Sequence, residues 1–300
     1  MMRILVTGGT GFIGKALVES LQIAKHAVIV VSRSPDSAAT KLPNTEFVSW
    51  DGLSQIFAEG VDAVVHLAGE TVQGRWNKKK IAEVRDSRMK CTKMLLDAIE
   101  SAKEPPNVLV SASGIGFYGE GGEELLPETA ESGTDYFAAL CVDWEAEAAR
   151  AGSVGCRVVF ARFGIVIGEG GGALDAMLLP TQMGIGGPLG SGQQWWSWVG
   201  IQDAVGAITY AVHDESINGP MNVVSPNPIR QHDFQRVLSR VLSRPSFMPA
   251  PSFALKMVLG TFAQEVLSSK RVIPAKLKNA GYQFSEVELE DVLRVALQRE

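Results

Sequence analysis

The chain contains 300 residues, of which 46% are hydrophobic, and it carries a formal net charge of −5. Such a chain can bury a large core and is expected to form one domain or two interlocked ones. The negative charge argues against a nucleic-acid partner, and no apolar run reaches the ~18 residues that a membrane helix needs. Cys91, Cys141 and Cys156 lack metal-like spacing, which predicts structural thiols in a reducing compartment and no metal site. We therefore expect a cytoplasmic globular protein without a signal peptide.

The first feature along the chain is a short apolar run, residues 4–6, followed by a glycine-rich segment and a helical pattern at 15–21. A dinucleotide site needs this order of strand, tight glycine turn and helix N-terminus. Gly9 and Gly11 can turn sharply and let the backbone approach a pyrophosphate, while Gly14 lets helix and strand pack closely. The alternative is a glycine turn that only joins a strand to a helix. The cofactor interpretation assigns to this segment the binding residues Gly8, Gly9, Thr10, Gly11, Phe12, Ile13 and Gly14.

A second apolar run, residues 27–31, predicts a strand buried on both faces of a parallel sheet. It ends in Ser32 and Arg33, about 20 residues beyond the glycines, where an NAD site carries an acidic residue for the ribose 2′-hydroxyl. The guanidinium of Arg33 suits a 2′-phosphate instead, because it offers bidentate hydrogen bonds. A solvated arginine would give the same pattern. We predict NADP(H) over NAD(H).

The next segments alternate between apolar runs and helical patterns. The predicted strands are 46–50, 63–69, 108–113 and 157–167, and the predicted helices are 81–101 and 143–151. Such alternation is typical of a parallel sheet with helices on both faces. Ala68 and Gly69 end one strand and allow close backbone approach to a ligand, whereas His66 within it is interpreted as a hydrogen-bonded core residue. Glu83 and Arg88 either face the cofactor or are solvated charges.

Beyond residue 168 glycine-rich stretches replace the regular alternation, and three tryptophans follow at 195, 196 and 198. These tryptophans either pack in a core or wall a substrate cleft. A strand at 221–224 is expected to return to the main sheet, and the rest of the chain is rich in helices. We predict an α/β fold with a Rossmann-type doubly wound parallel sheet. Its NADP-binding domain is expected to span 1–168 with 201–225, and a smaller C-terminal substrate lobe to span 169–200 and 226–300.

These segments together resemble the extended short-chain dehydrogenase/reductase superfamily over essentially the whole chain. Residues 7–14 resemble its T-G-x-x-G-x-x-G fingerprint, residues 62–69 its D-x-V-x-H-L-A-A segment, and residues 111–119 the strand that carries its active-site serine. Other segments resemble the atypical branch named epimerase family proteins, which has a C-terminal lobe of unknown function: 75–77, 87–88, 170–173, 186–192 and 222–226. The resemblance implies an NADP site lined by Ser32, Arg33, Leu67, Ala68, Glu83, Arg88 and Val166.

The resemblance also raises the question of catalysis. The superfamily uses a Tyr-x-x-x-Lys pair, in which the lysine lowers the pKa of the tyrosine. Tyr136 has Leu140 four residues later, and in the frame of Phe137 the lysine position holds Cys141. No lysine occurs between Lys103 and Lys256, so the pair is absent in either frame. Ser113 matches the serine position, although a serine that ends a buried strand can be purely structural.

Three hypotheses follow for the function. The first is an atypical NADP(H)-dependent oxidoreductase or nucleotide-sugar epimerase, with Ser113 orienting the substrate and Tyr136 or Tyr118 as the acid or base. The second is a catalytically silent NADPH-binding or redox-sensing module that acts through a protein partner. The third, a structural scaffold, conflicts with the glycine fingerprint and Arg33. For the first we expect a small-molecule substrate, such as a nucleotide sugar or a carbonyl compound, and a monomer or homodimer without a membrane or nucleic-acid partner.

Overall fold

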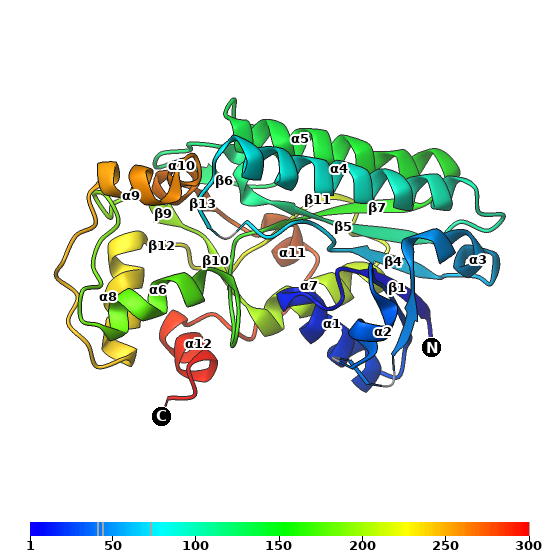
Figure 1. Ribbon diagram of the computed structural model, residues 1–300, viewed down its shortest axis with the longest axis horizontal. Helices are drawn as coiled ribbons and strands as arrows, with labels where there is room; N and C mark the ends of the chain where they lie inside the picture. The colour runs from blue at the N-terminus through cyan, green and yellow to red at the C-terminus, as the bar shows by residue number, and fades with distance from the viewer. Residues whose placement is uncertain (41, 44, 73, 300) are drawn as a thin grey trace.

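The computed structural model describes residues 1–40, 42–43, 45–72 and 74–299 (Figure 1). Its centre is a seven-stranded parallel sheet in the order β11-β7-β5-β4-β1-β2-β3. Reversal of the strand order at β1 makes the sheet doubly wound, as predicted. The strands are β1 (Arg3–Thr7), β2 (Ala27–Val31), β3 (Glu46–Val48), β4 (Ala63–His66), β5 (Val108–Gly114), β7 (Arg157–Phe163) and β11 (Gly219–Val223).

Helices cover both faces of this sheet because its strands are apolar on both sides. Ile4 and Val6 of β1 face one layer, and Leu5 faces the other. The first layer contains α1 (Phe12–Ile23) and α7 (Ile201–His213), and the second contains α3 (Leu53–Ala58), α4 (Lys78–Glu100) and α5 (Tyr136–Ala148). Figure 1 shows the layers on opposite sides of the sheet. A short helix, α2 (Pro35–Ala39), follows β2.

The predicted strand at 157–167 is wrong as a single element. β7 ends at Phe163, and β8 (Ile165–Ile167) leaves the main sheet to pair with β10 (Trp198–Gly200). Gly164 lies at the break, where a Cβ atom would be 2.5 Å from the carbonyl oxygen of Ser197. A glycine is therefore required for the chain to cross here.

The predicted helix at 143–151 begins too late. α5 starts at Tyr136, because the side chain of Asp135 accepts a hydrogen bond from the backbone amide of Ala138 at 2.9 Å. An aspartate in this position is a typical N-cap. Residues of the predicted C-terminal turn form a 3₁₀ helix instead, Ala149–Val154. The earlier start brings the first turn of α5 to the end of β5, where the 3₁₀ turn Ile115–Tyr118 also begins.

The C-terminal part of the chain builds a smaller cluster beside the sheet. Its core contains Trp196, Trp198 and Phe234, so these two tryptophans are buried packing residues. β11 pairs with β7 and so returns to the main sheet. No helix in the described ranges is long and apolar enough to span a membrane. The elements of the cluster are α6 (Gly172–Gln182), β9 (Trp195–Trp196), β12 (Ile229–Arg230), α8 (Gln231–Val241) and α12 (Leu289–Ala296).

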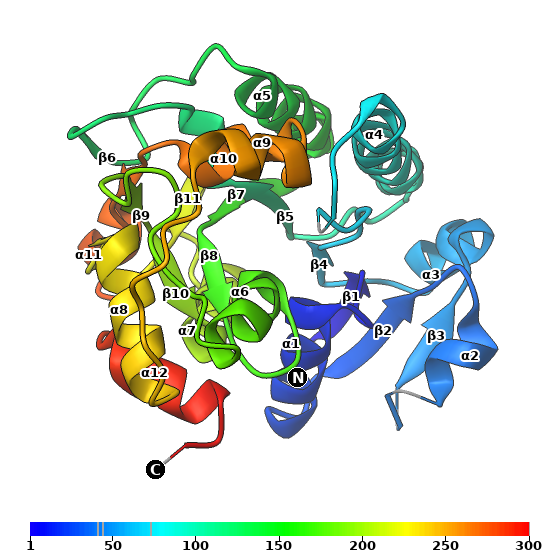
Figure 2. The same cartoon turned by 60° about the vertical axis from the view of Figure 1, so that its left-hand side comes forward.

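Four further elements connect this cluster to the main sheet. β13 (Arg271–Val272) pairs in parallel with β6 (Leu125–Leu126). α9 (Ser252–Leu259) precedes α10 (Phe262–Leu267), which reaches the first turn of α5, where Phe262 contacts Phe137 with ring centroids 6.2 Å apart (Figure 2). The C-terminal segment therefore reaches the edge of the sheet at which β5 ends.

Candidate functional site

The glycine turn lies where β1 meets α1. Gly8 adopts a positive φ of +72°, and a Cβ atom there would lie 2.7 Å from the carbonyl carbon and oxygen of Leu67. A Cβ on Gly14 would lie 2.1 Å from the carbonyl oxygen of Gly8. Only glycine fits either position. The turn is thus pressed against both the end of β4 and the start of α1.

Gly9 and Gly11 play a different part from the sharp turns predicted for them. Neither has a positive φ. A Cβ on Gly9 would press into the side chain of Val30 at 2.8 Å, so this glycine permits close packing on β2. Gly11 is the extended N-cap of α1, and its amide donates to the carbonyl oxygen of Gly8 at 2.9 Å. The left-handed turn is made by Gly8 instead.

The N-terminus of α1 suits an anion. The helix has 12 residues, its N-cap makes no side-chain hydrogen bond, and its first turn holds no acidic residue. The first N–H groups of a helix lack intrahelical partners and carry the positive end of the dipole. Phe12 packs against the loop after β8, where a Cβ on Gly171 would lie 2.5 Å from its ring. Val166 belongs to this β8 strand and is buried in the same core as α1.

Ser32 and Arg33 leave the sheet next to the turn. The register of β1 and β2 pairs Thr7 with Val31, so the residues that follow these strands emerge at neighbouring points. Arg33 is exposed. The pKa of Glu70 is lowered first by a hydrogen bond from Lys80, and the nearby charges of Arg33 and Arg88 lower it further. Residues at the carboxyl ends of β2 and β4 therefore meet beside the glycine turn.

Arg88 and Glu83 have different surroundings, although both lie on α4. The Arg88 guanidinium covers Gly69 and donates to the carbonyl oxygen of Glu70 at 3.1 Å. It lies 5.0 Å from the centre of the Trp144 ring, and burial lowers its pKa. Glu83 is 48% exposed and pairs with Lys79 at 3.7 Å. Arg88 thus packs against the segment that contains Ala68 and Gly69, whereas Glu83 forms an ion pair on the α4 surface.

His66 is a buried core histidine next to the glycine turn. Its ring nitrogens lie 2.7 Å from the hydroxyl of Thr7 and 2.9 Å from that of Thr92. The Thr7 hydroxyl in turn accepts from the backbone amide of Ala68 at 3.2 Å. Burial, together with the charge of Arg88, lowers the pKa of His66 from 6.5 to about 3. The neutral ring therefore ties β1, β4 and α4 together.

This lowered pKa predicts a pH-dependent stability. Between pH 6.5 and about 3 the unfolded chain binds a proton at His66 and the folded chain does not, so the unfolding free energy falls as the pH decreases. From pH 7 to pH 4.5 this histidine should account for about 2.5 kcal/mol of the loss. Urea denaturation of wild type and His66→Gln at both pH values measures it. The variant is less stable at pH 7 but should lose less on acidification; equal losses would contradict the prediction.

A buried polar network lies at the end of β5. The Ser113 hydroxyl donates to Oε1 of Glu145 at 2.6 Å. Arg162 holds the same carboxylate with two hydrogen bonds, from Nε at 2.8 Å and from Nη2 at 2.7 Å. Its Nη1 donates to the hydroxyl of Tyr118 at 3.0 Å, which donates to Asn222 at 2.6 Å. All five side chains are buried, and the Ser113 proton is directed at a carboxylate.

Glu145 and Arg162 were not singled out in the sequence. A signal existed for each, because one is an acidic residue on the apolar side of α5 and the other is a charge inside the apolar strand β7. A buried charge requires a partner. The sequence could not pair them, since they lie on different elements and 17 residues apart.

The catalytic lysine is absent in both possible alignments with the superfamily's Tyr-x-x-x-Lys pair. Tyr136 takes the tyrosine position in one alignment, and Cys141 takes the lysine position in the other. The Tyr136 hydroxyl donates to the carbonyl oxygen of Ile81 on α4 at 3.2 Å, and burial raises its pKa. Cys141 is buried with its Sγ 3.7 Å from the carbonyl oxygen of Gly114. Burial raises the pKa of Cys141 to about 12, and the charges of Glu145 and Glu265 add to the effect. The Cys141 thiol therefore lies at the end of β5, whereas the Tyr136 hydroxyl is hydrogen-bonded to the backbone of α4.

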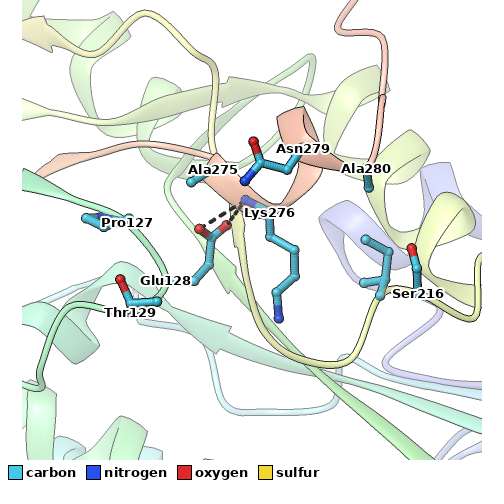
Figure 3. Close-up of a pocket in the computed structure, with 9 residues that line it drawn as sticks. Pro127, Glu128, Thr129, Ser216, Ala275, Lys276, Asn279 and Ala280 are labelled. Atoms are coloured by element: carbon cyan, nitrogen blue, oxygen red, sulfur yellow. Dashed lines mark hydrogen bonds between the residues drawn. The ribbon is translucent and has the colours of Figure 1, made fainter.

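An open cavity of about 530 Å³ lies elsewhere, between α11 (Ala275–Asn279) and the loops that flank it (Figure 3). The Glu128 carboxylate accepts hydrogen bonds from the backbone amide of Lys276 at 3.1 and 3.2 Å. The lining residues come from the β6 side, from the loop before β11 and from α11. None of the residues predicted for the cofactor or for catalysis lines this cavity.

Comparison with known proteins gives the family. Residues 4–224 match the model of the NAD dependent epimerase/dehydratase family, and residues 250–296 match that of a domain of unknown function. The chain belongs to the NAD dependent epimerase/dehydratase family. The predicted relationship to epimerase family proteins and the predicted Rossmann-type fold are both confirmed.

Three known proteins illustrate the similarity. The chloroplastic SDR39U1 homolog of Arabidopsis thaliana is 39% identical, over 99% of this chain and 87% of its own length. The crystal structure of human epimerase family protein SDR39U1 with NADPH superimposes with a TM-score of 0.90 at 36% identity, covering 99% of both chains. A nucleoside-diphosphate sugar epimerase from Corynebacterium glutamicum has a TM-score of 0.78 at 33% identity, covering 99% of this chain and 58% of its own.

Proposed function

We propose that this chain binds NADP(H) in the glycine turn and is an atypical oxidoreductase or epimerase. The observation that carries the proposal is the juxtaposition of a glycine-only turn, an uncapped helix N-terminus and Arg33 at one edge of the sheet. The helix N-terminus would hold the pyrophosphate, and Arg33 with Ser32 would hold the 2′-phosphate. The human relative crystallised with NADPH supports the choice of cofactor.

The proposed site continues from the glycine turn along the carboxyl edge of the sheet. Leu67, Ala68 and Gly69 would flank the cofactor, and Arg88, Val166 and Glu83 would stand around it. The bound nicotinamide supplies hydride transfer. Ser113 would orient a substrate hydroxyl, because its own proton is engaged with Glu145 and its lone pairs remain to accept a hydrogen bond from that hydroxyl. Domain 1–168 with 201–225 would hold the cofactor and the C-terminal lobe the substrate.

A nucleotide sugar or a small carbonyl compound is the proposed substrate. The C. glutamicum relative, named a nucleoside-diphosphate sugar epimerase, supports the first class. An alcohol or carbonyl carbon is in both classes the centre that a nicotinamide oxidises or reduces. The alternative role is an NADPH-binding module without turnover, favoured by the buried Cys141 at the lysine position.

The test is a titration of the purified protein with NADPH and NADH, followed by turnover assays. NADPH should bind roughly tenfold or more tightly than NADH, because of the charge-assisted 2′-phosphate contact. The double variant Ser113→Ala, Tyr136→Phe should retain NADPH binding and lose most turnover of UDP-sugars or small ketones. Full turnover by the double variant would exclude both residues from catalysis. Binding without wild-type turnover would favour the silent module, and absence of binding would overturn the proposal.

A further inference from the structure

The C-terminal segment places an acidic side chain at the end of β5. The Glu265 carboxylate of α10 approaches the 3₁₀ turn after β5, with both oxygens 3.6 Å from the position that a Cβ on Gly116 would occupy. Phe137, in the first turn of α5, reaches the same position from another side at 3.4 Å. Glu265 therefore lies close to the first turn of α5, the helix that would carry the superfamily's Tyr-x-x-x-Lys pair, although it is more than 100 residues away in the sequence.

A buried lysine accompanies this carboxylate. Lys270 is 3% exposed, and its Nζ lies 3.1 Å from Oε2 of Glu265 and hydrogen bonds to the hydroxyl of Ser268. Its backbone is held at both ends, because its amide donates to Trp195 at 3.0 Å and its carbonyl accepts from Ser197 at 2.9 Å. A lysine so fixed keeps its charge at one point and orients the carboxylate beside it.

The Glu265 carboxylate has unused capacity to accept hydrogen bonds. Oε2 is buried and, among the described residues, has the ion-pair contact with Lys270 but no hydrogen bond of acceptable geometry. The side chain is 23% exposed, so the group is not sealed inside the fold. An ionised carboxylate accepts about four hydrogen bonds and is costly to bury with fewer. Because Oε2 is buried against Lys270, a donor from outside the chain, such as a substrate hydroxyl, would reach the other oxygen, Oε1, which is not buried and has no hydrogen bond to the described residues.

The neighbours of Glu265 connect it to Ser113. The charges of Glu265 and Glu145 both act on the Cys141 thiol, which lies 3.7 Å from the carbonyl oxygen of Gly114. Glu145 is the acceptor of the Ser113 hydroxyl. Both carboxylates thus raise the pKa of one thiol at the end of β5. One is neutralised by Arg162 inside the network, and the other is paired with Lys270 and retains an acceptor site.

We propose that Glu265 is a catalytic residue that contacts the substrate and exchanges a proton with its reacting oxygen, and that Lys270 is its positioning residue. The inference rests on the proposed function. In the oxidative direction, the O–H bond of a substrate secondary alcohol breaks and its proton passes to the Glu265 carboxylate. The C–H electron pair leaves as hydride to the oxidised nicotinamide, and a C=O bond forms. Reduction returns the hydride to carbon and the proton from Glu265 to oxygen.

The test compares Glu265→Ala and Glu265→Asp with the control Glu288→Gln, which changes an exposed acidic residue of the same C-terminal segment. The probes are UDP-glucose, UDP-N-acetylglucosamine and 9,10-phenanthrenequinone with NADP⁺ or NADPH. Glu265→Ala should lower kcat by about 100-fold while the Kd for NADPH changes less than twofold. Added formate should restore at least a tenth of the kcat that Glu265→Ala loses. Glu265→Asp should retain part of the wild-type kcat. Glu288→Gln should match wild type.

Lys270 is tested by rescue with a conservative variant. Lys270→Met should lower kcat by roughly tenfold with little change in KM, and Lys270→Arg should restore it, because a cation is what positions the carboxylate. If Glu265→Ala does not fold, the near-isosteric Glu265→Gln takes its place and should show the same loss. Turnover of Glu265→Ala or Glu265→Gln within twofold of wild type would overturn the inference alone. So would a loss of kcat in Glu265→Ala that neither added formate nor the Glu265→Asp substitution relieves. Absence of NADPH binding or of wild-type turnover would instead overturn the proposed function, and this inference with it.

Discussion

Replacement of Arg33 by alanine should weaken NADPH binding by about 10- to 100-fold and change NADH binding by less than about twofold. Only NADPH carries the 2′-phosphate, and Arg33 stands exposed directly after β2, where the adenosine ribose of a dinucleotide binds in this fold. A hydrogen bond between two charged groups contributes about 1.5 to 3 kcal/mol. Fluorescence titration of both cofactors at one fixed ionic strength measures the two ratios.

The matched control is Arg236→Ala on α8, which also removes an exposed arginine and changes the net charge equally. It should leave both affinities unchanged, and so it separates a local phosphate contact from a general charge effect. The Arg33 effect should also shrink as salt is added, because an exposed charge pair is screened. Equal losses for NADPH and NADH would show that Arg33 does not contact the 2′-phosphate.

Replacement of Arg162 by methionine should lower the free energy of unfolding by about 3 to 5 kcal/mol. Arg162 gives the buried Glu145 carboxylate two hydrogen bonds, and its removal leaves an unpaired charge in the core. It also removes the contact of the guanidinium with the Phe117 ring, whose centre lies 3.4 Å from Cζ. Urea denaturation at pH 7 measures the difference.

Two further variants test the cause of that loss. The double variant Arg162→Met, Glu145→Gln should recover part of the stability, because it no longer buries a charge without a partner. The exposed pair of Arg85 and Asp143, at 2.6 Å, provides the control, and Arg85→Met should cost less than about 1 kcal/mol. A small effect of Arg162→Met, similar to that of Arg85→Met, would contradict the buried ion pair as a major source of stability.

Much of the fold could be predicted because its signals are local. The run at 4–6, the glycines and the following helix are contiguous, and the fit of Gly14 depends only on its neighbours, since a Cβ there would lie 2.1 Å from the carbonyl oxygen of Gly8. The apolar run of β2 likewise indicated a strand covered on both faces, and the order of strands and helices indicated a doubly wound sheet. His66 was correctly interpreted as a core residue. The family followed from motifs of the same local kind.

Local sequence patterns give the wrong strand boundary where contact with a distant segment decides the path of the backbone. β8 departs from the line of β7 at Gly164, because the backbone of Ser197 passes close to this glycine. The residues around Gly164 in the sequence do not indicate this contact. The start of α5, by contrast, has a local signal, because Asp135 is an N-cap residue type directly before the helix. The left-handed glycine is Gly8, and the choice among neighbouring glycines depends on how the turn meets Leu67, directly after β4.

The amino-acid sequence by itself determined the dinucleotide-type turn, the α/β class and the family of this protein, because each depends on residues a few positions apart. Only the tertiary structure decided which side chains meet at the end of β5. Ser113, Glu145 and Arg162 come from three elements, and Glu265 with Lys270 arrives from a segment more than 100 residues further along the chain. Sequence spacing carries no information about such meetings, since chain connectivity and packing of the whole sheet bring them about.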